Sequence, residues 1–467
     1  MNGGDRYRLE RDSFGEVKIL EECLWGRQTQ RSLSYFAIGD DRLSKDAIYA
    51  FALIKKAAAI ANHKLGVLEE QHKNLIVNAC DAILRGEHGD QFPVSIWQTG
   101  SGTQSNMNLN EVIANLANLE VGAPAGSYMP VHPNDHVNRS QSSNDVFPTV
   151  MHLVATSMLS KQLLPALGAL IQIVADKEME FRHTIKCGRT HMMDATPVTL
   201  GQEFGGFKAQ LEFSLERISG AIESMREVAL GGTAVGTGFT APPDWTETVT
   251  AEINRLVDFE FSSKGNKFAL LAGHEALLHA QQQLNLLATT LMKIGNDVRL
   301  MGSGPRCGLA EIILPANEPG SSIMPGKINP TQVEALTMVC CRVMGNTTTV
   351  SVAASQGQFQ LNVYKPVILH CITESISLLS DAMASFSKHC LKGIQVNSAR
   401  LRSYTEQSLM LVTALSPHIG YDKAGKAAKL AYEKSITLRE AVLELKLLDA
   451  EQFDDLVKPE AMLGISD

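Results

Sequence analysis

One loop of the sequence, GSSIMPGKINP at residues 320–330, places two serines, a lysine and an asparagine among glycines and prolines. Its glycine spacing is one residue too long for a phosphate-binding Walker loop, and Ile328 stands where that loop needs a serine or threonine. The spacing of a serine-nucleophile elbow is also missing. We therefore interpret the segment as an anion-binding loop, in which Lys327 holds a carboxylate and Ser321 handles a proton.

His191, in the segment GRTH, is the best candidate for acid or base chemistry near neutral pH. A single histidine is more often a structural residue, so the catalytic interpretation requires a partner. Glu334, at the start of the helix expected after Pro330, could orient the imidazole and stabilise its charged form.

Two further segments are rich in small hydrogen-bonding side chains. They are TGSGTQSNMN from Thr99, which precedes a helix expected to begin near Asn110, and SQSSND from Ser140. Helix capping is one sufficient explanation for such residues. The alternative is an anion site, because hydroxyls and free N–H groups at a helix start can hold a carboxylate.

Two other polar segments suggest binding sites at first sight. GGTAVGTG at residues 231–238 lacks the strand and spacing of a dinucleotide-binding motif, so we expect a turn or a substrate-facing loop. His132, Asp135 and His136 are spaced closely enough to suggest metal ligands. No HExxH or Cys/His framework accompanies them, and His-Pro-Asn-Asp favours a turn, so no metal site is predicted.

Long helices are predicted to position these segments. Apolar residues recur at spacings of three and four along several runs, at 159–174, 204–225, 277–301, 333–343 and 361–386. Four or five such helices, without strand-like alternation, predict an all-α (mainly α) fold built on a long antiparallel bundle. The width of the apolar stripes favours oligomerisation through the bundle.

The predicted domain organisation has three parts. Residues 1–141 are expected to mix turns with shorter helices, residues 142–365 to form the long central bundle, and residues 366–467 to form a smaller helical C-terminal domain.

Composition limits the partners and the location. The chain has 467 residues, is 44% hydrophobic and carries a net charge of −8, with acids and bases scattered, which argues against nucleic-acid and membrane partners. The eight cysteines include no CxxC pair and are expected to be reduced, buried thiols. We find no signal peptide, no intact transit peptide and no uninterrupted apolar run long enough to span a bilayer. A cytoplasmic location is expected, or the mitochondrial matrix if a presequence has been removed.

The loop GSSIMPGKINP closely resembles the signature loop of the fumarase/aspartase superfamily, and the other polar segments match that superfamily in order from about Arg8 onward. TGSGTQSNMN, SQSSND, LWGRQTQRS and ALSPHIGYDKA are similar to class II fumarases, the metal-independent kind. The resemblance implies a fumarase/aspartase-like fold in a homotetramer, with a core of twenty helices and active sites where three subunits meet. It implies reversible hydration of fumarate to L-malate in the tricarboxylic acid cycle, with a small dicarboxylate substrate and no cofactor.

The resemblance also implies residue roles. Ser321 takes the carbon proton, Lys327 and Asn329 hold the aci-carboxylate that develops, and His191 with Glu334 acts on the hydroxyl that leaves as water. The residues expected to bind the substrate are Ser101, Thr103, Ser142, Ser143, Asn144, Thr190, Lys327 and Asn329. A second dicarboxylate site is implied at His132, Asn134 and Asp135, where Met129 replaces a basic residue of some members and weakens anion binding.

Two other interpretations remain. Aspartate ammonia-lyase, or another lyase of the superfamily, is disfavoured because aspartases tend to carry a glutamine in place of His191. A non-enzymatic scaffold would be expected to lack Ser321, His191 or Lys327, and all three are present.

Overall fold

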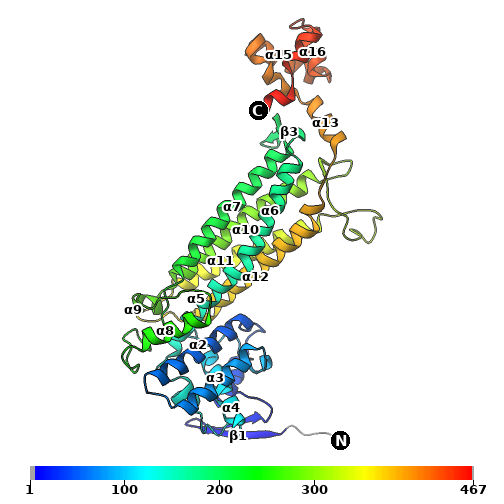
Figure 1. The fold of residues 1–467 in the computed structure, drawn as a ribbon. Helices are drawn as coiled ribbons and strands as arrows, with labels where there is room; N and C mark the ends of the chain where they lie inside the picture. Colours follow the sequence, from blue (N-terminus) through cyan, green and yellow to red (C-terminus); the bar gives the residue numbers. More distant parts are fainter. Residues whose placement is uncertain (1–5, 465–467) are drawn as a thin grey trace. The chain divides into compact units, whose positions relative to one another are not determined.

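A computed structural model describes residues 6–464, which are mainly α-helical, as predicted (Figure 1). The chain divides into two compact units. The first unit comprises residues 1–164, 216–286 and 341–378, and the second comprises residues 165–215, 287–340 and 379–467. The three-domain division stays a prediction.

The first unit opens with strands, which the sequence analysis did not expect. Strand β1 (Tyr7–Asp12) pairs antiparallel with β2 (Gly15–Leu20), so that Tyr7 faces Leu20. Helices then follow, namely α1 (Arg27–Tyr35), α2 (Lys45–Lys64), α3 (Glu70–Leu84) and α4 (Thr103–Glu120). The expected shorter helices are confirmed here, since the longest of them, α2, has 20 residues and the bundle helix α10 (Glu275–Met301) has 27.

Helix α4 begins at Thr103, so the predicted start near Asn110 is wrong. Its buried asparagines hydrogen-bond to neighbouring segments, some to side chains and some to backbone. Asn115 Nδ2 donates to Leu24 O (2.7 Å), and Asn118 Nδ2 donates to Val131 O (3.0 Å). Because buried polar groups require partners, these amides hold the adjoining loops against the helix.

The long helices predicted from periodicity are confirmed. Helix α5 (Ser143–Met158) continues through a π-helical turn, η3 (Leu159–Leu163), into α6 (Leu164–Glu180). The other long helices are α7 (Leu200–Ser224), α10 (Glu275–Met301), α11 (Thr331–Ala354) and α12 (Lys365–His389). The unit boundaries fall within α6, α7, α10, α11 and α12.

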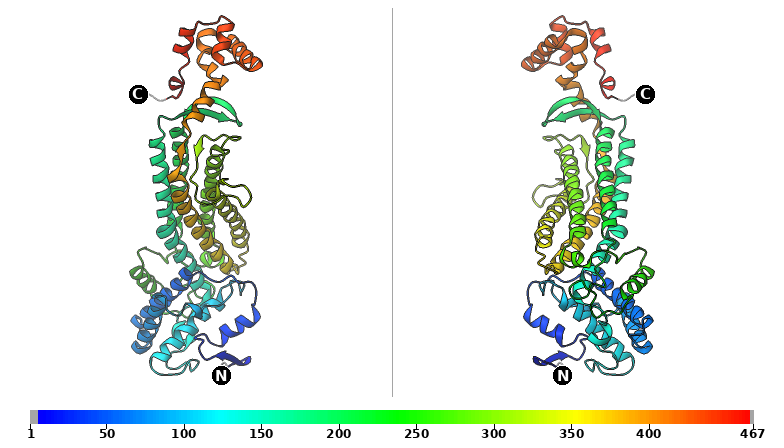
Figure 2. Two further views of the ribbon diagram at one scale, coloured as in Figure 1. Left: turned by 90° about the vertical axis from the view of Figure 1, so that its right-hand side faces the viewer. Right: turned by 90° about the vertical axis from the view of Figure 1, so that its left-hand side faces the viewer.

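Side-chain contacts join these helices within each unit. In the first unit, Gln281 of α10 donates to Thr347 Oγ1 of α11 (3.0 Å) and Ser375 Oγ of α12 (3.2 Å). In the second unit, α6 and α7 run side by side (teal to green in Figure 2), and Lys208 Nζ donates to Glu178 Oε2 at 2.8 Å.

The remaining elements are short. Two further two-stranded sheets occur in the described chain, β3 (Ile185–Thr190) with β4 (Met193–Thr199) and β5 (Ile312–Ile313) with β6 (Gln395–Val396). The first unit also contains α8 (Trp245–Leu256) and α9 (Lys267–Ala272). The predicted short C-terminal helices are confirmed as α13 (Ser398–Gln407), α14 (Ser416–Ile419), α15 (Tyr421–Lys434), α16 (Leu438–Glu444) and α17 (Ala450–Leu456).

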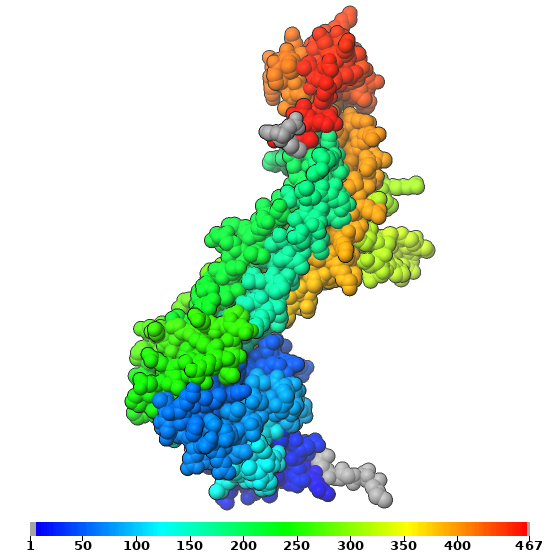
Figure 3. Space-filling model, in the orientation of Figure 1, coloured from blue at the N-terminus to red at the C-terminus, as the bar shows by residue number. Residues whose placement is uncertain are grey.

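The C-terminal helices have an apolar core of their own. It is built from Leu411, Leu415, Ala427, Leu438, Val442 and Phe453. These segments form one packed mass, coloured orange to red in Figure 3.

The expectation of buried thiols needs correction. Six cysteines are buried, but Cys307 and Cys341 are exposed, so the prediction of buried thiols is wrong for these two. Two helical segments, Ser143–Glu180 and Lys365–Gly393, are long and apolar enough by composition to cross a membrane. Core helices of a bundle commonly have this property.

Glu111 of α4 is a buried carboxylate that holds the start of α1. Its Oε2 accepts hydrogen bonds from Gly26 N (2.9 Å) and from Thr29 Oγ1 (2.6 Å), while Oε1 accepts one from Gln28 N (2.9 Å). The first N–H groups of a helix have no partner within it and favour negative charge. Burial raises the pKa of Glu111, although the hydrogen bonds oppose that change.

We expect Glu111→Gln to lower the free energy of unfolding by about 2–3 kcal/mol. The substitution removes the negative charge, and the NH₂ group of glutamine would face backbone N–H groups that need an acceptor. Unfolding followed by circular dichroism measures this loss. Glu120→Gln is the control, since Glu120 is exposed at the end of the same helix. Equal effects of the two substitutions would contradict the proposed role of Glu111.

Candidate active site

Three of the predicted substrate-binding hydroxyls meet in the first unit. Ser101 Oγ lies 2.8 Å from Thr103 Oγ1, which lies 2.7 Å from Ser143 Oγ. We call Ser101, Thr103 and Ser143 the hydroxyl cluster. It joins the first residue of α4 to the first residue of α5, so two helix N-termini and their free N–H groups lie close together.

Gly102 allows this approach. Its φ of 76° is left-handed, and a Cβ placed there would lie 2.0 Å from Phe147 Cδ2 of α5. No other residue fits this position without moving the two helix starts apart.

Asp145 fixes the start of α5. Ser142 is the N-cap and accepts a hydrogen bond from Asn144 N (3.2 Å), while Asp145 Oδ1 accepts one from Ser142 N (3.0 Å). Asp145 Oδ2 accepts hydrogen bonds from Gly231 N (3.0 Å) and Thr233 N (2.9 Å). Burial raises the pKa of Asp145 to about 6, against the effect of these hydrogen bonds.

The glycine-rich segment at residues 231–238 is a turn, as predicted, and it lies beside the start of α5. Asn144 Nδ2 also donates to Ala234 O (2.8 Å). The sequence analysis gave Asp145 no role, although Ser-x-x-Asp before an apolar run is the spacing of a capping box.

His191 lies at the tip of a β-hairpin in the second unit. Thr190 pairs with Met193, so His191 and Met192 form the turn, with φ values of 56° and 64°. Positive φ at both residues is the geometry of a type I′ turn. Thr190 and His191 are exposed, which leaves both side chains available to a ligand.

Buried ion pairs support this hairpin. Glu311 is fully buried, and its Oε1 lies 2.6 Å from Arg189 Nη1 and its Oε2 lies 2.7 Å from Lys186 Nζ. Lys186 Nζ also contacts Glu203 Oε2 at 2.6 Å. A carboxylate held by two cations fixes the strand that carries Thr190.

Ser321 lies in an irregular loop of the second unit. Its Oγ accepts hydrogen bonds from Ile323 N (3.3 Å) and Met324 N (3.0 Å). The loop closes on itself, because Gly320 N donates to Lys327 O (3.0 Å) and Asn329 Nδ2 donates to Gly320 O. The structure therefore brings Ser321, Lys327 and Asn329 into one loop, with the Lys327 side chain exposed.

Glu334 lies in the first turn of α11, and Glu334 N donates to Pro330 O (3.1 Å). Its side chain is exposed. Among residues 6–464 of this chain no hydrogen bond or ion pair joins Glu334 to His191, so their pairing stays a prediction.

The segment predicted as a second dicarboxylate site forms one π-helical turn, η2 (Pro133–Val137). His132 Nδ1 accepts hydrogen bonds from Asn134 N and Asp135 N, both at 3.2 Å. The side chains of Asn134 and Asp135 are exposed, as is Met129. No group of three or more His, Cys, Asp or Glu side chains in the described chain is arranged to hold a metal ion.

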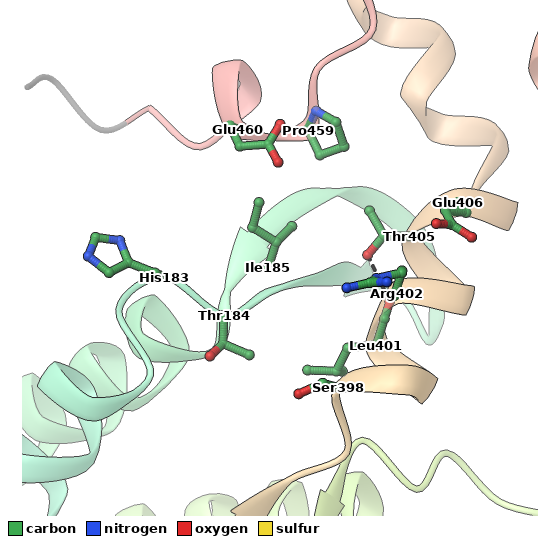
Figure 4. A pocket seen from close by; sticks show the side chains of 10 residues that line it. All are labelled: His183, Thr184, Ile185, Ser398, Leu401, Arg402, Thr405, Glu406, Pro459 and Glu460. Atoms are coloured by element: carbon green, nitrogen blue, oxygen red, sulfur yellow. Dashed lines mark hydrogen bonds between the residues drawn. The ribbon is translucent and has the colours of Figure 1, made fainter. Parts of the chain in front are cut away.

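A cavity of about 550 Å³ lies elsewhere in the second unit (Figure 4). It is lined by His183, Thr184, Ile185, Ser398, Leu401, Arg402, Thr405, Glu406, Pro459 and Glu460. None of the predicted site residues lines it. Its charged groups have both signs, so it offers no selective attraction for a dicarboxylate.

Known protein families match most of the chain. Residues 15–345 match a lyase family model, and residues 411–464 match the model of the fumarase C C-terminus. The chain is 54% identical to the class II fumarate hydratase of Thermosynechococcus vestitus over 457 residues, which are 98% of each protein. The chain belongs to the class II fumarate hydratase family.

Other members of this family are similar over the same length. The class II fumarate hydratase of Helicobacter pylori is 52% identical, with 98% of this chain and 99% of the relative covered. The crystal structure of class II fumarase from Schistosoma mansoni superposes with a TM-score of 0.95 at 44% identity, covering 98% of this chain and 99% of that one. The fumarase/aspartase-like fold expected from the sequence is thus confirmed, and the family activity is that of a hydro-lyase.

We expect Gly102→Ala to disrupt the hydroxyl cluster, because its Cβ would overlap Phe147. Activity should fall by at least about tenfold, since a displacement of binding groups by about 1 Å can cost on the order of 100-fold. Gly122→Ala is the matched control. Gly122 follows the other end of α4 with a φ of 78°, and a Cβ there would meet nothing within 4 Å.

Steady-state kinetics with L-malate compares the two variants. Both substitutions place alanine at positive φ, so a common loss of stability of about 1 kcal/mol is expected. A similar activity in both variants would contradict the positioning role of Gly102.

Proposed function

We propose that this chain is a fumarate hydratase that adds water reversibly to fumarate to give L-malate, and that it works as a homotetramer with active sites shared between subunits. The observation that carries the proposal is the setting of Ser321, whose Oγ accepts two N–H hydrogen bonds from its own loop. Family membership gives this loop its functional context.

The difficult step is removal of a carbon-bound proton. A proton beside a carboxylate is very weakly acidic until the charge that develops on the carboxylate is stabilised. Serine is normally too weak a base for this step, but N–H groups directed at Ser321 Oγ stabilise its alkoxide. We assign proton abstraction to Ser321 on this ground.

Lys327 and Asn329 are suited to hold the aci-carboxylate. Lys327 brings a positive charge on an exposed side chain, and Asn329 retains an N–H beyond the one that it donates to Gly320 O. Both come from the loop that carries the base, so one loop movement places base and charge together and excludes water.

We assign to His191 the acid/base role on the hydroxyl that leaves as water. The family resemblance gives Glu334 as the partner of His191. Its exposed place in a tight turn allows the imidazole to reach a substrate, while buried ion pairs hold the strand behind it. Thr190, the hydroxyl cluster, Ser142 and Asn144 are assigned to the substrate carboxylates, with Lys327 and Asn329.

The tetramer is supported by apolar side chains on the bundle. Met338 and Val352 of α11 are 67% and 59% exposed in the single chain. Burying such residues against other subunits would remove them from water.

We also propose a soluble enzyme of the tricarboxylic acid cycle, and a weakened second dicarboxylate site at His132, Asn134 and Asp135.

Purified protein given L-malate is expected to produce fumarate, seen as a rise in ultraviolet absorbance, and to show no rise with L-aspartate. The activity is expected to survive a chelator, because the proposed roles use only side chains and N–H groups. A rise with aspartate alone would contradict the proposal and favour an ammonia-lyase, and loss with chelator would contradict the metal-independent mechanism.

Ser321→Ala is expected to lower kcat by about 10²- to 10⁴-fold, the usual contribution of a positioned base. Binding of L-malate, measured by calorimetry, should change little. Ser322→Ala, one residue along the same loop, is the control and should keep nearly normal turnover. Nearly normal turnover of Ser321→Ala would exclude Ser321 as the base.

A further inference from the structure

Two lysines of the first unit are buried without an acidic partner in contact. Lys55, in the middle of α2, and Lys365, the first residue of α12, both have 0% exposure. Lysine is almost never fully buried unless it is paired, because the charge loses its hydration. Neither lysine forms an ion pair within 4.0 Å in the described chain.

Lys55 lies under the segment that leads into α5. Its Nζ donates to Asn138 Oδ1 and Gln141 Oε1, both at 3.0 Å. Both acceptors are neutral amide oxygens, so the hydrogen bonds orient the ammonium group without cancelling its charge. Gln141 directly precedes Ser142, the N-cap of the helix that carries Ser143 and Asn144.

The backbone of Lys365 contacts the segment that carries Ser101, the other half of the hydroxyl cluster. Lys365 N donates to Gly100 O (3.1 Å), next to Ser101. Its Nζ makes no hydrogen bond to any described residue. The start of a helix disfavours a cation. Lys365 is therefore unfavourable both in its burial without a partner and in its position at a helix N-terminus. Such local conflicts are expected at functional sites.

Asp145 is the one acidic group that interacts electrostatically with both lysines, and it compensates only part of their charge. Its oxygens are occupied by the N–H groups of the capping box and the glycine-rich turn. Burial lowers the pKa of Lys55 and of Lys365 to about 7, while attraction to Asp145 opposes the change. Two lysines against one carboxylate leave an excess of positive charge.

We infer that Lys55 and Lys365 are positioning residues that provide a positive potential behind the hydroxyl cluster and select a doubly charged substrate; this inference rests on the proposed function. The cluster itself consists of neutral hydroxyls, which hydrogen-bond a carboxylate but do not distinguish a dianion. Charges buried behind it act through a low-dielectric interior, where water and salt screen them little.

Lys55→Met and Lys365→Met test the inference, since methionine keeps much of the length and removes the charge. For each variant we expect the KM for L-malate and the Kd for succinate, a dianion that cannot react, to rise by about tenfold. The value of kcat should change by less than about twofold, because the lysines favour ground state and transition state alike.

Lys56→Met is the matched control on the same helix. Lys56 Nζ pairs with Asp81 Oδ1 of α3 at 2.6 Å. This substitution is expected to lower the melting temperature and to leave KM and Kd unchanged. A folded, active Lys55→Met or Lys365→Met variant with unchanged KM and Kd would overturn the inference.

A measurement on the wild-type protein tests the inference even if the lysine variants fail to fold. The Kd for succinate should rise from about pH 7, above the pKa of about 6 of Asp145, to about pH 9, as lysines with a pKa near 7 lose their charge. The titratable groups facing them are Asp145 and Cys80 for Lys55, and Asp145 and His274 for Lys365. Burial keeps Cys80 protonated and His274 neutral, because it raises the pKa of the thiol and lowers that of the imidazole.

The pH series is repeated on His191→Asn to remove the exposed imidazole, and the rise in Kd should persist. A Kd that is constant over this range in both proteins would overturn the inference. Failure of the proposed function is seen separately, as a wild-type protein that does not convert L-malate to fumarate.

Discussion

The buried carboxylate of Asp145 is the group on which the geometry of the first unit's binding segments depends. It accepts hydrogen bonds from Ser142 N, Gly231 N and Thr233 N, and so joins the start of α5 to the glycine-rich turn. Each hydrogen bond to a charged group contributes on the order of 1.5–3 kcal/mol. Because α5 also carries Ser143 against Thr103 of α4, one carboxylate sets the position of two helix starts.

The residues to which we assign proton transfer and charge stabilisation lie on a loop and a turn, and not at the starts of long helices. Ser321, Lys327 and Asn329 share an irregular loop whose hydrogen bonds are internal, and the Lys327 side chain is exposed. His191 lies on a turn supported from behind by the buried Glu311. In the proposed mechanism, fixed binding groups hold the substrate, and the loop brings the base together with Lys327 and Asn329 when it closes.

The sequence allowed the long helices to be predicted, because wide apolar stripes at helical spacing report directly on burial. It misled at the start of α4, where Asn106 and Asn108 were expected to precede the helix although both are buried in it and hydrogen-bonded. The sequence did not indicate the β-hairpin that carries His191, since His-Met is not a usual type I′ turn sequence. Lys55 and Lys365 were missed because an isolated lysine in an amphipathic helix normally lies on its solvated face.

The candidate site residues were predicted from motifs, because loop residues that bind anions are restricted in type and spacing. Their three-dimensional relations depend on tertiary contacts that no spacing encodes, such as the one between Thr103 and Ser143. The most direct test is a crystal structure of the Ser321→Ala variant with L-malate bound. We predict one malate carboxylate within hydrogen-bond distance of Thr103 and Ser143; malate bound elsewhere, with these hydroxyls contacting only each other, would contradict the account.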